Sequence, residues 1–323
     1  MALHLRGRDG AGAAAPRSRR RALVVLGALT LVTALATSLA LVTSPRDVAS
    51  AQATVTIQRA HSGAGTPSLK GRVTFLVIGS DSGAPKHGRG GTAAGGRSDS
   101  MHLIVLDTAA RRGISIGIPR DSYVSIPGHG TDKINAAMSS GGPPLLIRTI
   151  EQLTGIRVDY YLLTSFDGLV DLVNKVGGVT VGVDMNLVDS FSGANFRKGA
   201  QKLNGNQALA YSRARHGTPQ GDLTRSKHQG QVLLGGLATF QQQVAKDPSA
   251  VVKWLAVLND EVKTDIPFTE LMRLALVATQ VPPGRINNVV APGVPGSAGA
   301  ASVVRLTSGA TALFSRVRHG QYS

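Results

Sequence analysis

The chain has 323 residues, enough for one large domain or two small ones. It is 42% hydrophobic but only 4% aromatic, so its core must be built mainly from Ala, Val, Leu and Ile. The formal net charge of +16 predicts anionic partners such as nucleic acid, lipid head groups or phosphorylated substrates. The absence of cysteine excludes a disulfide framework and a thiolate zinc site.

The N-terminus predicts a membrane anchor. Four arginines between residues 17 and 21 precede an uncharged stretch over residues 22–43. As a helix that stretch spans roughly 33 Å, enough for the hydrocarbon core of a bilayer. We expect residues 1–21 to form a cytoplasmic tail and everything after Pro45 to lie outside the cell, because basic flanks stay in the cytoplasm. A cleaved signal peptide is the rival interpretation, but the apolar run is long for one.

Polar linkers surround the first strong strand. Residues 44–71 contain Pro, Ser and Gly and are expected to form a linker or a weak strand. Residues 72–81 have the apolar run and sharp polar end of a buried strand. The Gly-rich stretch over residues 82–96 predicts a loop.

The following segments alternate between strand and helix patterns. Residues 100–107 and 113–119 predict two strands, and the short link that contains Arg111 and Arg112 predicts a hairpin. The alternation predicts one α/β domain over residues 72–318, with a sheet covered by helices on both sides. Further strands are expected over residues 157–163, 178–183 and 286–292, and helices over residues 143–155, 165–177, 204–214, 224–245, 248–258 and 268–279.

Charged side chains gather at the ends of the first three strands. Asp81 ends the first strand, Arg97 and Asp99 precede the second, and Arg120 and Asp121 end the third. If these strands are neighbours, the groups meet at one edge of the sheet, where two carboxylates would suit a hard cation such as magnesium. The plainer interpretation is that each Asp caps a turn and each Arg pairs with it on the surface. Repetition at three strand ends favours a shared site.

A second polar cluster lies near two predicted helices. Arg213 and Arg215 share a face only in an extended segment, whereas Arg225 and Gln229 share a helix face at i, i+4. Arg225 and Gln229 also lie in the first turns of their helix, where free N–H groups favour an anion. A solvated basic face is the alternative. The preference for Arg over Lys favours bidentate phosphate binding.

Ordered sequence blocks between Thr74 and Leu237 carry a family resemblance. They read "FLVIGSD", "RSDSM", "IPRDSYVSIPG", "DKINAA", "GGP", "FDGLVDLVNKVGGV", "KGAQKLNGNQALAYSRARH" and "GDLTRSKHQ". In these blocks the chain resembles the LytR-CpsA-Psr family of membrane-anchored cell-wall phosphotransferases. The resemblance implies a central mixed sheet flanked by helices. It also implies the transfer of an anionic glycopolymer from a polyprenyl-pyrophosphate lipid to a peptidoglycan sugar hydroxyl outside the membrane, releasing polyprenyl phosphate.

The resemblance also implies roles for individual residues. Asp81 and Asp99 would hold Mg²⁺ (or Mn²⁺), and an apolar tunnel would hold the lipid chain. Lys133 is a further candidate for substrate binding, and with Asn135 it is expected to order a loop, although Asn135 equally suits a helix cap. The side chains that would bind the pyrophosphate are Arg97, Arg120, Arg213, Arg215, Arg225 and Gln229.

The sequence departs from the family pattern at two positions. Gly83 stands where the family commonly has Arg, and the nearest basic residues are Lys86 and Arg89. His228 replaces another Arg, which predicts pH-dependent binding. These departures bear on substrate preference and rate more than on the fold.

The sequence leaves alternatives open for the proton acceptor and for the function. Arg120 would help neutralise the phosphate charge, and Asp121 or Asp99 would accept the hydroxyl proton. Asp99 is a poorer base if it binds metal, while Asp121 suits equally a purely orienting ion pair with Arg120. Rival functions are a non-catalytic wall-polymer scaffold, a lipid pyrophosphatase and a DNA-binding regulator. The last is disfavoured, since no helix-turn-helix or aromatic stacking motif occurs and membrane topology explains the basic N-terminus.

Overall fold

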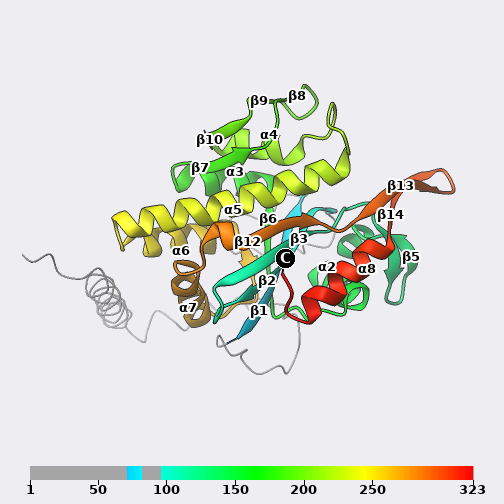
Figure 1. Cartoon of the computed structure of the whole chain (residues 1–323), viewed down its shortest axis with the longest axis horizontal. Coiled ribbons are helices and arrows are strands. Elements are labelled where there is room, and N and C mark those ends of the chain that lie inside the picture. Colours follow the sequence, from blue (N-terminus) through cyan, green and yellow to red (C-terminus); the bar gives the residue numbers. More distant parts are fainter. Residues whose placement is uncertain (1–70, 82–95, 323) are drawn as a thin grey trace, which may run out of the picture. The chain divides into compact units, whose positions relative to one another are not determined.

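The computed structural model describes residues 71–81 and 96–322 (Figure 1). The predicted tail (1–21), the predicted anchor (22–43) and all but the last residue of the predicted linker (44–71) lie outside the described residues. Nearly all of the predicted loop over residues 82–96, including Gly83, lies outside them too. No helix within the described residues combines the length and the apolar character needed to cross a bilayer.

A six-stranded mixed sheet forms the centre of the described domain, in the order β11-β6-β1-β2-β3-β12. Strands β1, β2 and β3 pair antiparallel as a meander, whereas β6 lies parallel to β1 and β12 lies parallel to β3. The predicted hairpin and the predicted α/β fold are thus confirmed. The strands are β1 (Arg72–Ser80), β2 (Ser98–Asp107), β3 (Arg112–Gly117), β6 (Tyr160–Ser165), β11 (Lys263–Thr264) and β12 (Ile286–Val290).

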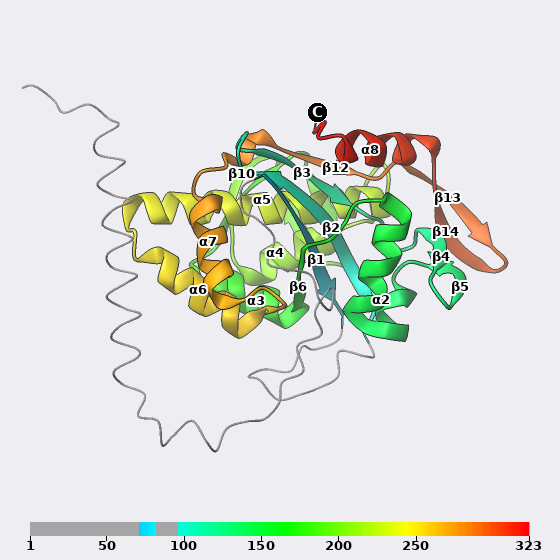
Figure 2. The same cartoon turned by 90° about the horizontal axis from the view of Figure 1, so that it is seen from below.

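Helices cover both faces of this sheet (Figures 1 and 2). Alternate side chains of β1 point to opposite faces. Leu76 and Ile78 pack into a core shared with α2 and α8, whereas Val73 and Phe75 pack against α7. The helices are α2 (Ala136–Thr154), α3 (Phe166–Lys175), α4 (Gly205–Arg213), α5 (Asp222–Lys246), α6 (Ala250–Glu261), α7 (Phe268–Ala278), α8 (Ser308–Arg318) and the 3₁₀ turn η1 (Pro283–Arg285).

Local sequence signals explain the helix boundaries. Ser165 caps α3, because its hydroxyl accepts a hydrogen bond from the Gly168 N–H at 3.0 Å. Gly155 ends α2 in the left-handed conformation, at the end of the helix expected over residues 143–155. Helix α2 begins earlier than expected, at Ala136, but it breaks at Gly141 and Gly142. Asn135 occupies the N-cap position of α2 without a side-chain capping bond.

Several elements were not predicted. One of them, β10 (Gly199–Leu203), pairs with the predicted strand β7 (Val179–Val183) outside the central sheet. Strands of three or four residues are too short to show a hydrophobic period, whereas α8 has buried apolar residues at helical spacing that could have revealed it. Strand β11 of the central sheet was not predicted either. The other unpredicted strands form three hairpins: β4 (Tyr123–Ile126) with β5 (Gly130–Lys133), β8 (Leu187–Asp189) with β9 (Ala194–Phe196), and β13 (Gly293–Ala298) with β14 (Ala301–Leu306).

Candidate functional site

The sheet topology brings charged strand ends to one edge. Because β1 and β2 are antiparallel, Asp81 after β1 lies beside Arg97 and Asp99 at the start of β2. Strand β3 runs antiparallel to β2, so Arg120 follows it at the same edge. An ion pair of 2.7 Å joins Arg120 Nη1 to Asp99 Oδ1. The convergence expected for these two residues is therefore present.

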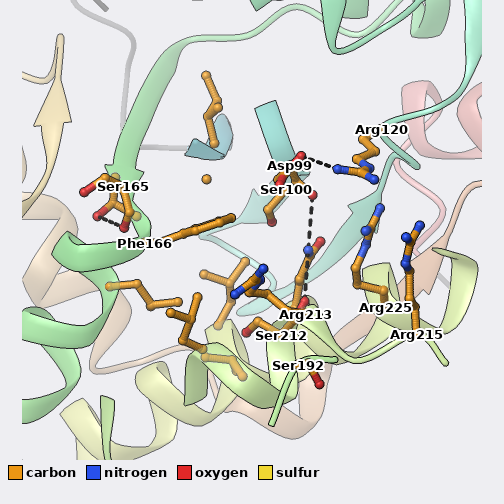
Figure 3. Close-up of a pocket in the computed structure, with 18 of the residues that line it drawn as sticks. Asp99, Ser100, Arg120, Ser165, Phe166, Ser192, Ser212, Arg213, Arg215 and Arg225 are labelled. Atoms are coloured by element: carbon orange, nitrogen blue, oxygen red, sulfur yellow. Dashed lines mark hydrogen bonds and ion pairs between the residues drawn. The ribbon is translucent and has the colours of Figure 1, made fainter. Parts of the chain in front are cut away.

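A cavity of about 350 Å³ opens beside this edge (Figure 3). Strands β1, β2 and β6, helices α3, α4 and α5, and the β8–β9 turn all contribute to its wall. Six of the predicted site residues line it: Asp99, Arg120, Arg213, Arg215, Arg225 and Gln229.

The opposite part of the cavity wall is apolar. Its aromatic member, Phe166, lies across the cavity from Arg120 and Arg225 in Figure 3. The Arg213 guanidinium lies 5.2 Å from the centre of the Phe166 ring, within cation–π range, and so links the charged part to the apolar part. The aliphatic residues are Val77, Ile78, Leu169, Leu209, Val232 and Leu233.

Carboxylates hold the arginines in place. Asp121 lies 3.6 Å from Arg120 and 3.0 Å from Lys133. Asp222, in the first turn of α5, lies 3.1 Å from Arg225 and 3.5 Å from Arg215. The guanidinium groups are therefore restrained before any ligand arrives, which lowers the entropic cost of binding an anion.

Gln229 connects three elements at the cavity wall. Its side-chain amide donates hydrogen bonds of 3.2 Å to the backbone carbonyls of Asp99 in β2 and Ser212 in α4. Since Gln229 belongs to α5, these bonds fix the separation of the two arginine-bearing helices from the sheet edge.

The charged environment shifts the pKa values of three groups. Burial works to lower the pKa of Arg120, but Asp99, Asp121 and Asp222 outweigh it and raise the pKa above its ordinary value. Burial lowers the pKa of Arg225, and the nearby Arg120 adds to that effect. Burial works to raise the pKa of Asp121, but hydrogen bonds with Asp222 and Lys133 and the charge of Arg120 lower it. Asp121 is therefore a weak base.

Four predicted site residues do not line the cavity. Asp121 lies one contact behind it, through Arg120, and Lys133 lies behind Asp121. Asp81 and Arg97 lie at the same sheet edge, where the Arg97 N–H donates a 2.8 Å hydrogen bond to Asp81 Oδ1.

His228 also lies away from the cavity. Its ring is fully buried and stacks on Tyr211, with 4.3 Å between the ring centres. Burial lowers its pKa, so it is neutral near pH 7. His228 therefore packs α5 against α4 and does not line the cavity.

Two carboxylates are available for a divalent cation. Within residues 71–81 and 96–322, no group of three or more His, Cys, Asp and Glu residues is arranged to hold a metal ion. Asp81 and Asp99 lie at one sheet edge, and each uses one oxygen in a bond to Arg97 or Arg120. Mg²⁺ commonly takes one or two carboxylates and completes its shell with water and phosphate oxygens, so this donor set fits a metal that arrives with a phosphate ligand.

Sequence reasoning missed three residues around the cavity. Asp222 stands three residues before Arg225, a spacing that predicts an ion pair on a helix. Phe166 follows the capping Ser165, and an apolar residue at helical spacing indicates a core position, not a cavity wall. Asp189 had no sequence signal, since most of its partners are backbone N–H groups, two of them far along the chain.

Comparisons with known proteins point to one family. The model of the LytR_cpsA_psr family matches residues 39–313. The teichoic acid transferase TagU of Enterococcus faecalis, named as acting from polyisoprenyl-teichoic acid to peptidoglycan, is 33% identical over 224 residues, covering 68% of this chain and 70% of that protein. The corresponding transferase TagV of Bacillus subtilis is 35% identical over 187 residues, covering 55% of this chain and 47% of that protein. This chain thus matches less than half the length of TagV.

Solved structures share the fold. The crystal structure of B. subtilis TagV has a TM-score of 0.65 at 27% sequence identity, covering 79% of this chain and 98% of that chain. The structure of TagT bound to LI-WTA has a TM-score of 0.64 at 22% identity, covering 82% and 96% of the two chains. At that lower identity the likeness concerns the fold alone.

Proposed function

Because the chain belongs to the LytR-CpsA-Psr family, as the resemblance predicted, we propose that it transfers an anionic glycopolymer from a polyprenyl-pyrophosphate carrier to a peptidoglycan sugar hydroxyl. The observation that carries this proposal is the cavity with arginines on one part of its wall and apolar side chains on another. Relatives named as teichoic acid transferases to peptidoglycan support the reaction class.

The cavity suits an amphiphile that joins a diphosphate to a hydrocarbon chain. Arg120, Arg215 and Arg225 would bind the phosphate oxygens, because guanidinium groups can fork onto them. Phe166 and the neighbouring aliphatic side chains would contact the first isoprene units of the lipid. A free nucleotide or a soluble sugar phosphate would leave this apolar part of the wall in water.

The transfer needs charge neutralisation and positioning more than covalent chemistry. The acceptor hydroxyl oxygen forms a bond to the phosphorus that carries the polymer. The bond from that phosphorus to the bridging oxygen breaks, the hydroxyl proton passes to the Asp99 carboxylate or to the leaving phosphate, and polyprenyl phosphate leaves. The arginines offset the charge that develops on the phosphate oxygens in a partly dehydrated site. Asp121 is assigned an orienting role, because it lies behind Arg120, pairs with two cations and has a lowered pKa.

The proposal includes Mg²⁺ (or Mn²⁺) and a membrane tether. Asp81 and Asp99 would hold the ion together with substrate phosphate oxygens, and the ion would supply further positive charge there. A single-pass anchor over residues 22–43 would leave the N-terminus in the cytoplasm and the catalytic domain outside. Both substrates would then be confined near the same membrane face, which raises their effective concentration.

The activity test uses the full chain in detergent with a polyprenyl-pyrophosphate-linked glycopolymer and peptidoglycan. We expect polymer to be transferred and polyprenyl phosphate to be released, and Arg120→Ala to lower the rate by at least about 100-fold, because it removes a charge-stabilising group. The control is Arg157→Ala, since Arg157 is 60% exposed and pairs with Asp159 near the start of β6.

Three outcomes would contradict the proposal. Release of polyprenyl phosphate without polymer on the peptidoglycan would identify a lipid pyrophosphatase. Lipid binding without release would identify a scaffold. Equal rates for wild type and Arg120→Ala would place the chemistry elsewhere in the molecule.

A further inference from the structure

A buried carboxylate joins the β8–β9 turn to the segment after α4. The Asp189 side chain is completely inaccessible to solvent. Its Oδ2 accepts hydrogen bonds from the backbone N–H groups of Arg215 at 2.9 Å and His216 at 3.1 Å. Its Oδ1 accepts one from Phe191 N–H at 3.0 Å. One side chain therefore holds two segments that are more than twenty residues apart in the sequence.

The carboxylate is strongly held in its charged form. Burial alone would raise the pKa of Asp189, but backbone hydrogen bonds from Arg215, His216, Phe191 and Ser192 outweigh burial and lower the pKa far below its usual range. Bonds to an ionised acceptor are shorter and stronger than neutral ones. The backbone at Arg215 is thus fixed at neutral pH.

The segment that Asp189 holds carries part of the anion-binding wall. Helix α4 ends at Arg213, and Ala214 after it is extended, so helical hydrogen bonds do not restrain Arg215. The Arg215 side chain is 40% exposed and reaches Asp222 at 3.5 Å, so burial does not fix its direction either. Both Arg215 and Asp189 line the cavity. The hydrogen bond from the Arg215 N–H to Asp189 therefore fixes the backbone position from which the Arg215 side chain extends.

An aromatic contact strengthens this junction. The Phe191 ring lies tilted against His216, with 4.3 Å between ring centres, although Phe191 is 79% exposed. Exposed loops are usually mobile, but here the turn and the segment after α4 are joined by the carboxylate and by the ring contact. Both rings line the cavity beside Arg215.

We propose that Asp189 is a positioning residue that holds Arg215 in the anion-binding wall of the cavity. This inference rests on the proposed function, because it takes the wall to bind a diphosphate. The competing account is that Asp189 only stabilises the β8–β9 hairpin and has no influence on the ligand.

The test measures inorganic pyrophosphate binding to the full chain in detergent by calorimetry. Asp189→Asn keeps the shape of the side chain but replaces one acceptor oxygen with a donor that faces N–H groups. We expect the dissociation constant to rise about tenfold, through displacement of Arg215. The matched control is Asp159→Asn, because Asp159 also accepts a backbone hydrogen bond, from Thr74 N–H at 2.9 Å, but does not line the cavity.

A double-mutant cycle separates positioning from stability. If Asp189 acts through Arg215, Asp189→Asn should change the pyrophosphate affinity by less than about twofold in an Arg215→Ala background. Equal effects in both backgrounds, or a lowered Tm with unchanged affinity, would overturn the proposal. If Asp189→Asn does not fold, the cycle is repeated with Asp189→Glu, which keeps the charge but displaces it. The same results would support or overturn the proposal.

Failure of the inference and failure of the proposed function look different. If the wild type binds pyrophosphate and Asp189→Asn binds it with the same affinity, only the role of Asp189 is rejected. A wild-type protein that binds no pyrophosphate rejects the diphosphate site and the inference together.

Discussion

Arg120 and Arg225 carry the same charge in opposite electrostatic surroundings. Three carboxylates surround Arg120 and raise its pKa, so much of its charge is already compensated. Arg225 is buried, pairs with Asp222, and has a pKa lowered by burial and by Arg120. A buried and less compensated cation gains more from an incoming anion. Arg225 is therefore the side chain for which a phosphate ligand would bring the larger electrostatic relief.

His102 is a buried titratable residue beneath the cavity wall. It lies in β2, its Nδ1 is 3.2 Å from the Ser115 hydroxyl, and Gln229 and Ser226 of α5 lie beside it. Burial lowers its pKa to about 4. An unfolded histidine has a pKa near ~6.5, so between pH 4 and 6.5 the unfolded state binds more protons than the folded state. The free energy of unfolding must therefore rise with pH through this window and level off above it.

We predict that this pH dependence follows His102. Between pH 7.5 and 5 the free energy of unfolding should fall by about 2 kcal/mol from this residue alone. His102→Gln should reduce that fall, measured by urea denaturation at both pH values, while His228 contributes in the same direction because its pKa is also lowered. The control is His319→Gln in the exposed last turn of the chain. An unchanged pH slope in His102→Gln would show that the folded protein admits the charged ring.

At the scale of elements, α5 does most to assemble the site. Its first turns carry Arg225 and Gln229 to the charged part of the wall, with Asp222 paired to Arg225, and Val232 and Leu233 follow on the apolar part. Because a helix turns once every 3.6 residues, charged and apolar residues spaced along α5 can face the same cavity. Further along, α5 packs closely on β7, which fixes its distance from the second core.

Two adjacent glycines test this close packing. A methyl group on Gly235 would lie 2.5 Å from the Thr180 carbonyl oxygen, whereas one on Gly236 would have no atom within 4 Å. We predict that Gly235→Ala lowers the free energy of unfolding by about 1–3 kcal/mol. Gly236→Ala should raise it by about 0.5–1 kcal/mol, because alanine is the better helix former. Urea denaturation of both variants would check this, and similar values for the two would mean that α5 does not approach β7 so closely.

At the scale of the whole molecule, ligand and metal binding are expected to depend on each other. Asp81 and Asp99 alone do not complete the coordination shell of Mg²⁺, and pyrophosphate would supply further oxygen ligands. Mg²⁺ and pyrophosphate together should therefore raise the Tm of the full chain more than the sum of their separate effects. With the complex at 100 times its dissociation constant, the shift should be on the order of 5 °C. Thermal unfolding with each component alone and with both would measure it.

Asp81 allows the metal contribution to be separated from anion binding. Because Asp81 does not line the cavity, Asp81→Asn should keep the Tm shift caused by pyrophosphate alone and lose the increment from Mg²⁺. Asp247→Asn, at the end of α5, serves as the control. A wild-type response of Asp81→Asn to Mg²⁺ would exclude Asp81 as a metal ligand.

The sequence by itself determined the long helices, the core strands and the family. Helical and strand periods, the Ser165 cap and the Gly155 stop are local signals, and the ordered blocks from Thr74 to Leu237 are specific as a set. It also indicated which arginines and carboxylates to examine, because charges at strand ends and in first helical turns have a local meaning.

Only the tertiary structure decided which of those groups share a cavity. Asp99, Arg120 and Arg225 meet there, whereas Asp81, Lys133 and His228 do not line it. The sequence could not separate these two sets, since their placement depends on strand pairing and on helix packing across more than a hundred residues. The same holds for Asp189, most of whose partners are backbone N–H groups. Every residue type offers that donor except proline, so the pattern of side chains contains no trace of the contact.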